Sequence, residues 1–204
     1  MIRPWAFTQL RSLGIAMNSY AGDHSSRFPG MGHYPGQTAP DGTAYEDDLS
    51  WDGELEDYLG LSGVIVKTTP PVVPKAHEGI FLHGNDKLTG DNKGKKFAYA
   101  LRSFAMFSSW GAGLPVARAS DPSRTGLLSE RPWTGGRAAF KSAADLSNTA
   151  QWKKNLDTGE ELNSGGKYHV LFVDGHIETL APKETVGTGS LGKPLGPWTL
   201  DAND

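Results

Sequence analysis

The chain has 204 residues and a net charge of −3, and 10% of its residues are aromatic. This aromatic content argues against a disordered polypeptide. There is no basic stripe with interleaved aromatic residues, so nucleic acid is not an expected partner. Cysteine is absent, which excludes thiol catalysis, disulfide bonds and cysteine-based zinc sites. No apolar run approaches the roughly 20 residues that span a bilayer.

The first predicted element is an amphipathic helix over residues 4–21. Its apolar side chains recur at spacings of three and four residues, which places on one packing face Leu10, Leu13, Met17 and Tyr20. Pro4 suits the first helical turn, where a missing N–H costs nothing. Gly22 can close the helix, and Pro29-Gly30 prevents its return.

The segment that follows predicts a second short helix over 51–59. Ser50 is a suitable N-cap, and Gly60 stops the helix. Its expected buried stripe is Leu55, Tyr58 and Leu59. Further on, short apolar stretches between Gly, Pro, Asp and Asn residues predict strands at 64–66, 79–82, 97–108 and 125–129. Residues 138–156 are a candidate for one more helix.

The clearest predicted element is a β-hairpin over 168–180. Asp174-Gly175 can supply the two positive φ angles of a type I′ turn. Such a two-residue turn pairs Val173 with His176 and places His169 near Leu180. These elements together predict an α+β fold, in which an N-terminal helix packs on a small antiparallel sheet with long loops. The chain carries 26 Gly and 13 Pro, which is in keeping with many loops.

Two sequence motifs suggest chemistry that their context does not support. Residues 187–193 nearly match a phosphate-binding loop, but such a loop needs Ser or Thr after the Lys and a following helix, whereas Pro194 follows here. Ser190 and Lys193 fit a Ser-x-x-Lys pattern, which needs a helix and partner motifs that the chain lacks. We therefore expect neither nucleotide binding nor an acyl-enzyme, and interpret 181–204 as an irregular Gly/Pro-rich tail.

Metal ligands show no diagnostic spacing. The six histidines are scattered and are expected at the surface, although His24 with Asp23, or His33, could join a zinc site in three dimensions. Calcium prefers six to eight oxygen ligands, and loops rich in Asp and Asn can supply them. One candidate set is Asp86, Asp91 and Asn92. A second acidic group comprises Asp41, Glu46, Asp47, Asp48, Asp52, Glu54, Glu56 and Asp57.

Aromatic side chains could also form a platform for a glycan or protein ligand, since Trp and Tyr dominate recognition hot spots. The candidates near Gly/Pro-rich or uncertain segments are Trp110, Trp133, Trp152 and Trp198. The alternative interpretation is that at least half of them pack in the core.

Several segments, taken in order, resemble one family. The chain is similar to prepilin-type, pseudopilin-like proteins, which carry an N-terminal cleavage and methylation motif and a C-terminal pattern of His, nine residues, then Asp-Gly. The segments that carry the resemblance are FTQLRSLGIAMNSYAGDHSSRFPG (7–30), WDGELEDYLG (51–60), RSFAMFSS (102–109), DPSRTGLLSE (121–130) and GGKYHVLFVDGHIETL (165–180).

The resemblance implies a type IV pilin-like or type II secretion pseudopilin-like protein. Residues 1–23 would be the C-terminal part of the long pilin helix, and residues 24–204 the globular head. The implied function is that of a non-catalytic subunit of a pilus-like or pseudopilus-like filament, with Leu10, Leu13, Met17 and Tyr20 as the helix or filament packing face. Implied partners are other pilin-like subunits and the inner membrane, facing the periplasm or the cell surface.

Three positions depart from the family pattern. Ser164 stands where the His of the His-nine-Asp-Gly pattern would be, so only Asp174 and Gly175 carry that motif. Ala6 and His83 occupy positions where many relatives have Cys. The leader and the apolar N-terminal segment are missing, so we expect the natural protein to carry them ahead of Arg3. The alternative is a paralogue that never had them.

Two other functions stay open at this point. A membrane-anchored cell-surface binding module would recognise a glycan or a protein through exposed tryptophans. A hydrolase using a pair of carboxylates would need a deep pocket with two close acids, one of raised pKa. No feature of the sequence favours the hydrolase.

Overall fold

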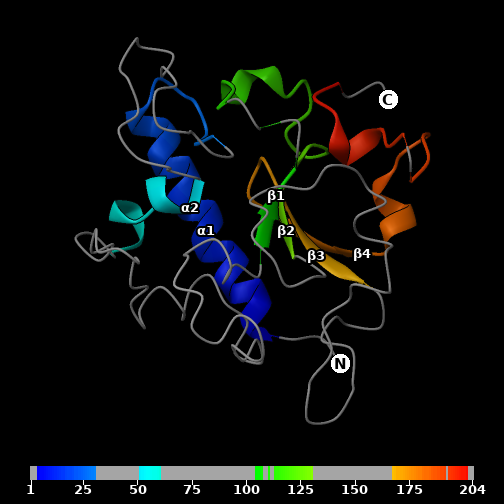
Figure 1. The fold of residues 1–204 in the computed structure, drawn as a ribbon, viewed down its shortest axis with the longest axis horizontal. Coiled ribbons are helices and arrows are strands. Elements are labelled where there is room, and N and C mark those ends of the chain that lie inside the picture. Colours follow the sequence, from blue (N-terminus) through cyan, green and yellow to red (C-terminus); the bar gives the residue numbers. More distant parts are fainter. Residues whose placement is uncertain are drawn as a thin grey trace, which may run out of the picture.

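The computed structural model describes residues 4–30, 51–60, 104–107, 110, 113–130, 167–191 and 193–201. Within these residues the chain has an α+β fold, as expected. Helix α1 (Pro4–Asp23) lies across an antiparallel sheet of four strands in the order β1-β2-β3-β4 (Figure 1). The strands are β1 (Phe104–Met106), β2 (Gly126–Glu130), β3 (Tyr168–Phe172) and β4 (Ile177–Leu180). The strands expected at 64–66 and 79–82 and the helix at 138–156 lie outside the described residues.

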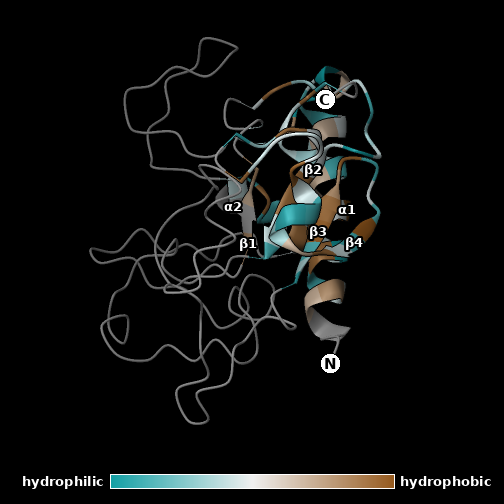
Figure 2. Ribbon diagram, turned by 90° about the vertical axis from the view of Figure 1, so that its right-hand side faces the viewer, coloured by the Kyte–Doolittle hydropathy of each residue, from teal (hydrophilic) through white to brown (hydrophobic). Residues whose placement is uncertain are grey.

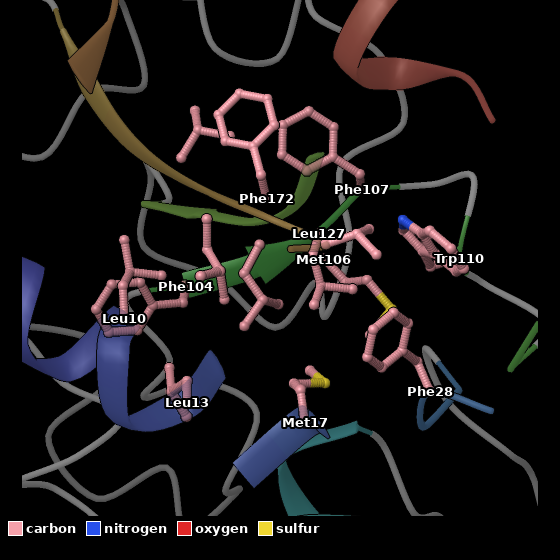
Figure 3. Close-up of a cluster of buried hydrophobic side chains, with 14 of the residues drawn as sticks. Leu10, Leu13, Met17, Phe28, Phe104, Met106, Phe107, Trp110, Leu127 and Phe172 are labelled. Carbon is pink, nitrogen blue, oxygen red and sulfur yellow. The ribbon is translucent and has the colours of Figure 1, made fainter. Parts of the chain in front are cut away.

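Helix α1 is packed on the sheet by the apolar face that its periodicity predicts. Leu10, Leu13 and Met17 are fully buried, and Figure 3 shows them pointing toward side chains of the strands. The helix comes very close to β3 at Gly14, where an added Cβ atom would lie 3.1 Å from a methyl carbon of Leu171. Since side chains alternate along a strand, Leu171 and every second residue of β3 face the helix.

The opposite face of the sheet is covered by the C-terminal tail. Two 3₁₀ turns, η7 (Pro182–Thr185) and η8 (Gly196–Trp198), lie within this tail. The buried Trp198 ring packs on Phe107 with 4.6 Å between ring centroids, and its Nε1 donates to Thr185 Oγ1 at 3.1 Å. In Figure 3, Phe107 and Phe172 lie on the side of the strands away from α1. The sheet is therefore covered on both faces.

The second predicted helix is shorter than expected. Residues 51–59 form α2 (Trp51–Glu54) followed by the 3₁₀ turn η1 (Asp57–Leu59). Leu55 is buried as predicted, Tyr58 and Leu59 are half-buried, and Trp51 is fully buried. Gly60 ends the turn in the left-handed conformation with φ of 69°, as expected of the residue that stops the segment.

The hairpin over 168–180 is confirmed, but its predicted register is wrong. We expected Val173 to pair with His176 and His169 to lie near Leu180. The observed register is shifted by one residue, with pairs Tyr168–Leu180, His169–Thr179, Val170–Glu178 and Leu171–Ile177.

The turn explains the shifted register. Phe172 N–H donates to the His176 carbonyl at 2.9 Å, and Gly175 N–H donates to the Phe172 carbonyl at 3.0 Å. The connection is therefore a three-residue loop. Gly175 has φ of 92°, whereas Asp174 does not have the positive φ that a type I′ turn also requires at its first central residue. A three-residue loop with glycine in its last position is the common alternative.

The end of α1 also differs from the prediction. The helix continues through Gly22 to Asp23, and the reversal falls on Ser25 and Ser26, with φ of 53° and 57°. Ser26 N–H donates to the Ala21 carbonyl at 2.8 Å, which closes the last turn. Two adjacent non-glycine residues in the left-handed region carry a steric cost of roughly 1 kcal/mol each.

We predict that Ser26→Gly stabilises the protein by about 1 kcal/mol, because glycine adopts positive φ without a Cβ clash. Ser19→Gly is the matched control: Ser19 is exposed within α1, and glycine there should destabilise by about 0.5 kcal/mol. Chemical denaturation of both variants measures the change. Equal destabilisation by the two substitutions would contradict the proposed strain.

We predict the opposite sign for Gly126→Ala. A Cβ atom at Gly126 would lie 3.0 Å from two carbons of the Phe107 ring and 3.1 Å from the Pro197 carbonyl oxygen, so the tail would have to move. The expected loss is about 1–3 kcal/mol. Gly22→Ala, where an added Cβ atom meets no heavy atom within 4 Å, should instead stabilise by up to about 1 kcal/mol. Thermal or denaturant unfolding distinguishes the two.

Candidate functional site

The outer face of α1 is the most distinctive exposed surface of the described residues. Phe7 and Ile15 are the large apolar side chains exposed there, at 41% and 64% of their surface. Arg11 lies between them and is also exposed. The three residues are spaced four apart, so they lie along one side of the helix. We call Phe7, Arg11 and Ile15 the outer stripe.

Small polar side chains next to the outer stripe satisfy their hydrogen bonds within the helix. Ser12 Oγ donates to the Thr8 carbonyl at 3.1 Å, and Asn18 Nδ2 donates to the Gly14 carbonyl at 2.9 Å. α1 carries no carboxylate before Asp23.

The outer stripe is not the face that sequence reasoning assigned to filament packing. Leu10, Leu13 and Met17 are buried between α1 and the sheet, so their side chains are not available to a second molecule, whereas Tyr20 is half-buried beside Tyr58. Sequence reasoning missed Phe7 and Ile15, because two apolar residues eight positions apart give a weak signal beside a dense stripe. Their shared face with Arg11 was the signal that could have found them.

The backbone at the start of α1 lies clear of the sheet. Figure 2 shows the first turn of the helix extending past the strands. The outer stripe therefore runs along a helix whose first turn is not enclosed by the sheet. Among the described helices, none has both the length and the apolar character needed to cross a bilayer.

The far end of α1 carries an acidic aromatic patch, made of Tyr20, Asp23, His24, Asp57 and Tyr58. The Tyr20 and His24 rings stack with 3.8 Å between centroids, and the Tyr58 ring meets Tyr20 edge-on at 5.7 Å. Tyr58 Oη donates to Asp23 Oδ2 at 3.0 Å. Burial, this hydrogen bond and the charges of Asp23 and Asp57 raise the pKa of Tyr58, so its hydroxyl stays protonated and donates to Asp23. The negative charge of the patch comes from Asp23 and Asp57.

A buried polar row lies beneath the N-terminal half of α1, on strands β2, β3 and β4. Glu130 Oε2 accepts the backbone N–H of His169 at 2.7 Å, and His169 Nδ1 lies 2.8 Å from Thr179 Oγ1. The expectation of a surface position is wrong for His169, which is 1% exposed: it lies on the helix-facing side of β3 with Leu171, and β3 is buried on both faces.

The buried polar row has the residue types of an acid–base site but not its geometry. Glu130 contacts the His169 backbone instead of the imidazole ring. His169 Nε2 is buried and has no hydrogen-bond partner, and the Phe7 ring lies edge-on to the imidazole with 6.3 Å between centroids. The imidazole is 1% exposed and therefore closed to a substrate in this structure, which makes the row a poor candidate for catalysis.

The hairpin tip holds the family-motif residues Asp174 and Gly175 in a structural role. Asp174 Oδ1 accepts the backbone N–H of His176 at 3.0 Å and lies 2.5 Å from His176 Nδ1. Asp174 N–H donates to the Pro122 carbonyl at 3.2 Å, and Val173 N–H donates to the Thr125 carbonyl at 3.0 Å. The tip is thereby attached to the turn over 121–125.

Asp121 organises the turn that holds the hairpin tip. Its Oδ1 accepts the Ser123 hydroxyl at 2.6 Å and the Ser123 backbone N–H at 3.0 Å. The Ser123 hydroxyl, the Ser123 N–H and the charge of Arg124 lower the pKa of Asp121, although burial opposes them. The Thr125 hydroxyl donates to the Asp121 carbonyl at 2.9 Å, which closes the turn.

No metal site is evident within the described ranges. No group of three or more His, Asp or Glu side chains in them could hold a metal ion. His24 is exposed at the end of α1, stacked on Tyr20. The calcium candidates Asp86, Asp91 and Asn92 lie outside the described residues, as do His33, His77, His83, Asp41, Glu46, Asp47 and Asp48.

Two of the tryptophans proposed for a ligand platform belong to the core. Trp110 and Trp198 are buried, and Trp110 Nε1 donates to the Gly126 carbonyl at 2.9 Å. They cannot present a surface to a ligand. Trp133 and Trp152 lie outside the described residues.

The glycine-rich segment over 187–193 is part of the tail packing. Gly187 has φ of 55°, and an added Cβ atom there would lie 2.9 Å from the Gly196 nitrogen. Ser190 and Lys193 exchange backbone hydrogen bonds at 3.0 and 3.1 Å, so these N–H groups are already paired. The glycines permit close backbone contact and do not form a phosphate cradle.

Comparison with known proteins found no match among protein-family models, curated proteins or solved structures.

We predict that acid weakens the protein partly through Asp121. Its folded pKa lies below the unfolded value of about 3.9, so its stabilising effect is present above pH ~4 and is lost as the pH falls through the folded pKa. In Asp121→Asn, the free energy of unfolding should therefore fall less steeply between pH ~5 and pH ~3 than in the wild type. Ser123→Ala removes the hydroxyl donor and should flatten the profile in part. An unchanged slope in Asp121→Asn would contradict the role of this carboxylate.

Proposed function

We propose that the chain is the head of a pilin-like structural subunit, without catalytic activity, and that the outer stripe of α1 contacts neighbouring subunits. The observation that carries the proposal is the exposed apolar pair Phe7 and Ile15 on a helix whose opposite face is fully used by the sheet. α1 is apolar on its buried face and also on part of its outer face. Its buried face packs on the sheet, and we propose that its outer face packs on a second molecule.

The expected strength of the contact suits an assembly that forms only at high local concentration. Burying a large apolar side chain fully stabilises by about 1.5–3 kcal/mol, so the partly exposed Phe7 and Ile15 would supply a few kcal/mol per contact at most. Such a contact is weak between free molecules in solution. Attachment of many copies to one membrane raises their effective concentration and makes weak contacts sufficient.

The proposed context follows from the sequence resemblance. In the natural protein, an apolar segment would continue α1 and anchor the head to the inner membrane or thread it into a filament. Other pilin-like subunits would be the partners, on the periplasmic side or at the cell surface. An amphipathic helix on an antiparallel sheet, with its first turn clear of the strands, supports this arrangement (Figure 2).

The buried polar row supports a structural role over an enzymatic one. The acid and the imidazole nearest to catalytic geometry, in Glu130 and His169, are buried, and the hydroxyl of Thr179 is half-buried beside them. Their hydrogen bonds connect neighbouring strands, and His169 is only 1% exposed to solvent. The same three residues thus hold the sheet together where the helix crosses it.

We predict that Ile15→Asp abolishes association between copies tethered in parallel. The chain, carrying an N-terminal hexahistidine tag, is bound to vesicles with nickel-chelating lipid, and association is measured by energy transfer between dye-labelled copies. A charge in place of Ile15 removes the apolar contact without touching the core, because this side chain is 64% exposed. Energy transfer should fall to the level of dilute, non-associating copies, while the unfolding midpoint stays unchanged.

Lys193→Asp is the control, since Lys193 is exposed on the C-terminal tail and away from the stripe. This variant should associate as the wild type does. Absence of association by the tethered wild type, or undiminished association by Ile15→Asp, would refute the proposed interface.

A further inference from the structure

Arg11 is an exposed cation that has no ion pair or hydrogen bond within the described residues. It lies on the outer stripe between Phe7 and Ile15. Long side chains on a helix surface often pair with an acid three or four residues away. Those positions hold Phe7, Thr8, Gly14 and Ile15, so α1 offers Arg11 no such partner.

The acidic aromatic patch has the complementary character. Asp23 and Asp57 bring two carboxylates to Tyr58, and α1 has no basic residue in its last turn. The C-terminal end of a helix carries partial negative charge, which favours a nearby cation. An arginine suits such a place, because its planar group can pair with a carboxylate and stack on an aromatic ring.

Arg11 and the acidic aromatic patch cannot contact each other within one molecule. Asp23 lies 12 positions after Arg11 on α1, a distance of about 18 Å along the axis at ~1.5 Å per residue. At ~3.6 residues per turn, the two side chains also point about 120° apart around the helix. A contact between them therefore joins two different surfaces of two molecules, a heterologous contact that can repeat from one subunit to the next.

We propose that Arg11 of one copy binds the acidic aromatic patch of a second copy, offset by about 18 Å along parallel helices. The inference rests on the proposed function, because parallel alignment comes from a common anchor. The occupant is a second copy because one chain carries both the unpaired cation and the acceptor, at positions that only an offset neighbour can bring together. The outer stripe then supplies apolar contact, and the ion pair sets the offset.

Charge reversal tests the pairing in the same tethered system. Arg11→Glu and Asp57→Lys should each weaken association roughly tenfold, because like charges then face each other across the contact. Asp57→Lys keeps the hydrogen bond between Tyr58 and Asp23 in place. The double variant Arg11→Glu/Asp57→Lys should recover most of the association, and Lys193→Glu, a reversal on the tail, should leave it unchanged.

Cysteine cross-linking tests the geometry independently. The chain has no cysteine, so every disulfide forms between introduced residues. Tethered copies of Arg11→Cys/Asp23→Cys should give a ladder of trimers and longer species on oxidation, because each copy has two different neighbours. Arg11→Cys alone and Asp23→Cys alone should remain largely monomeric.

The outcomes separate this inference from the function on which it rests. If the tethered wild type does not associate, both are wrong. A second case is that the wild type associates and Ile15→Asp abolishes this association. If charge reversal then has no effect, or if the double charge variant does not regain association, only the pairing of Arg11 with the acidic aromatic patch is wrong. Dimers without longer species from either single-cysteine variant would indicate a symmetric contact and would also overturn it.

Discussion

The packing of α1 on the helix-facing side of the sheet is the interaction on which the rest of the structure depends. Leu10, Leu13 and Met17 fill that face, and Gly14 lets the helix backbone approach Leu171 closely. This packing fixes the rotation of α1 about its own axis and therefore determines which residues are exposed. The exposed residues on the other side of the helix are those of the outer stripe. The surface proposed for assembly is thus a consequence of the core.

The sheet also depends on α1 for its stability. Its strands are three to five residues long, and strands of this length are stable only when a hydrophobic face packs against another layer. α1 covers one face and the C-terminal tail covers the other. The close contacts at Gly14, Gly126 and Gly187 all occur where a covering layer or the tail itself leaves no space for a Cβ atom. The glycine content, which suggested only loops, thus also reflects tight packing.

The sequence correctly predicts the elements that local residue patterns determine. It does not predict the features that depend on contacts between distant segments. The inner face of α1 and the location of the hairpin follow from spacing and from Asp174-Gly175. The hairpin register does not, because Asp-Gly fits both a two-residue and a three-residue loop, and bonds from the tip to Pro122 and Thr125 belong to the observed one. The burial of His169 follows from the cover on both faces of β3, by α1 and by the C-terminal tail, and alternation along one strand does not reveal the second cover.

The weakness of the proposed interface is a physical requirement, since a subunit must stay dispersed until it is placed in an assembly. Two partly exposed apolar side chains and one ion pair at a solvent-exposed surface give little affinity in free solution. Parallel tethering removes much of the entropic cost and fixes the relative direction of neighbouring helices. Under that constraint, the separation of Arg11 from Asp23 along α1 is enough to select one offset among many. The same residues would be ineffective between freely tumbling molecules, where no common axis defines the offset.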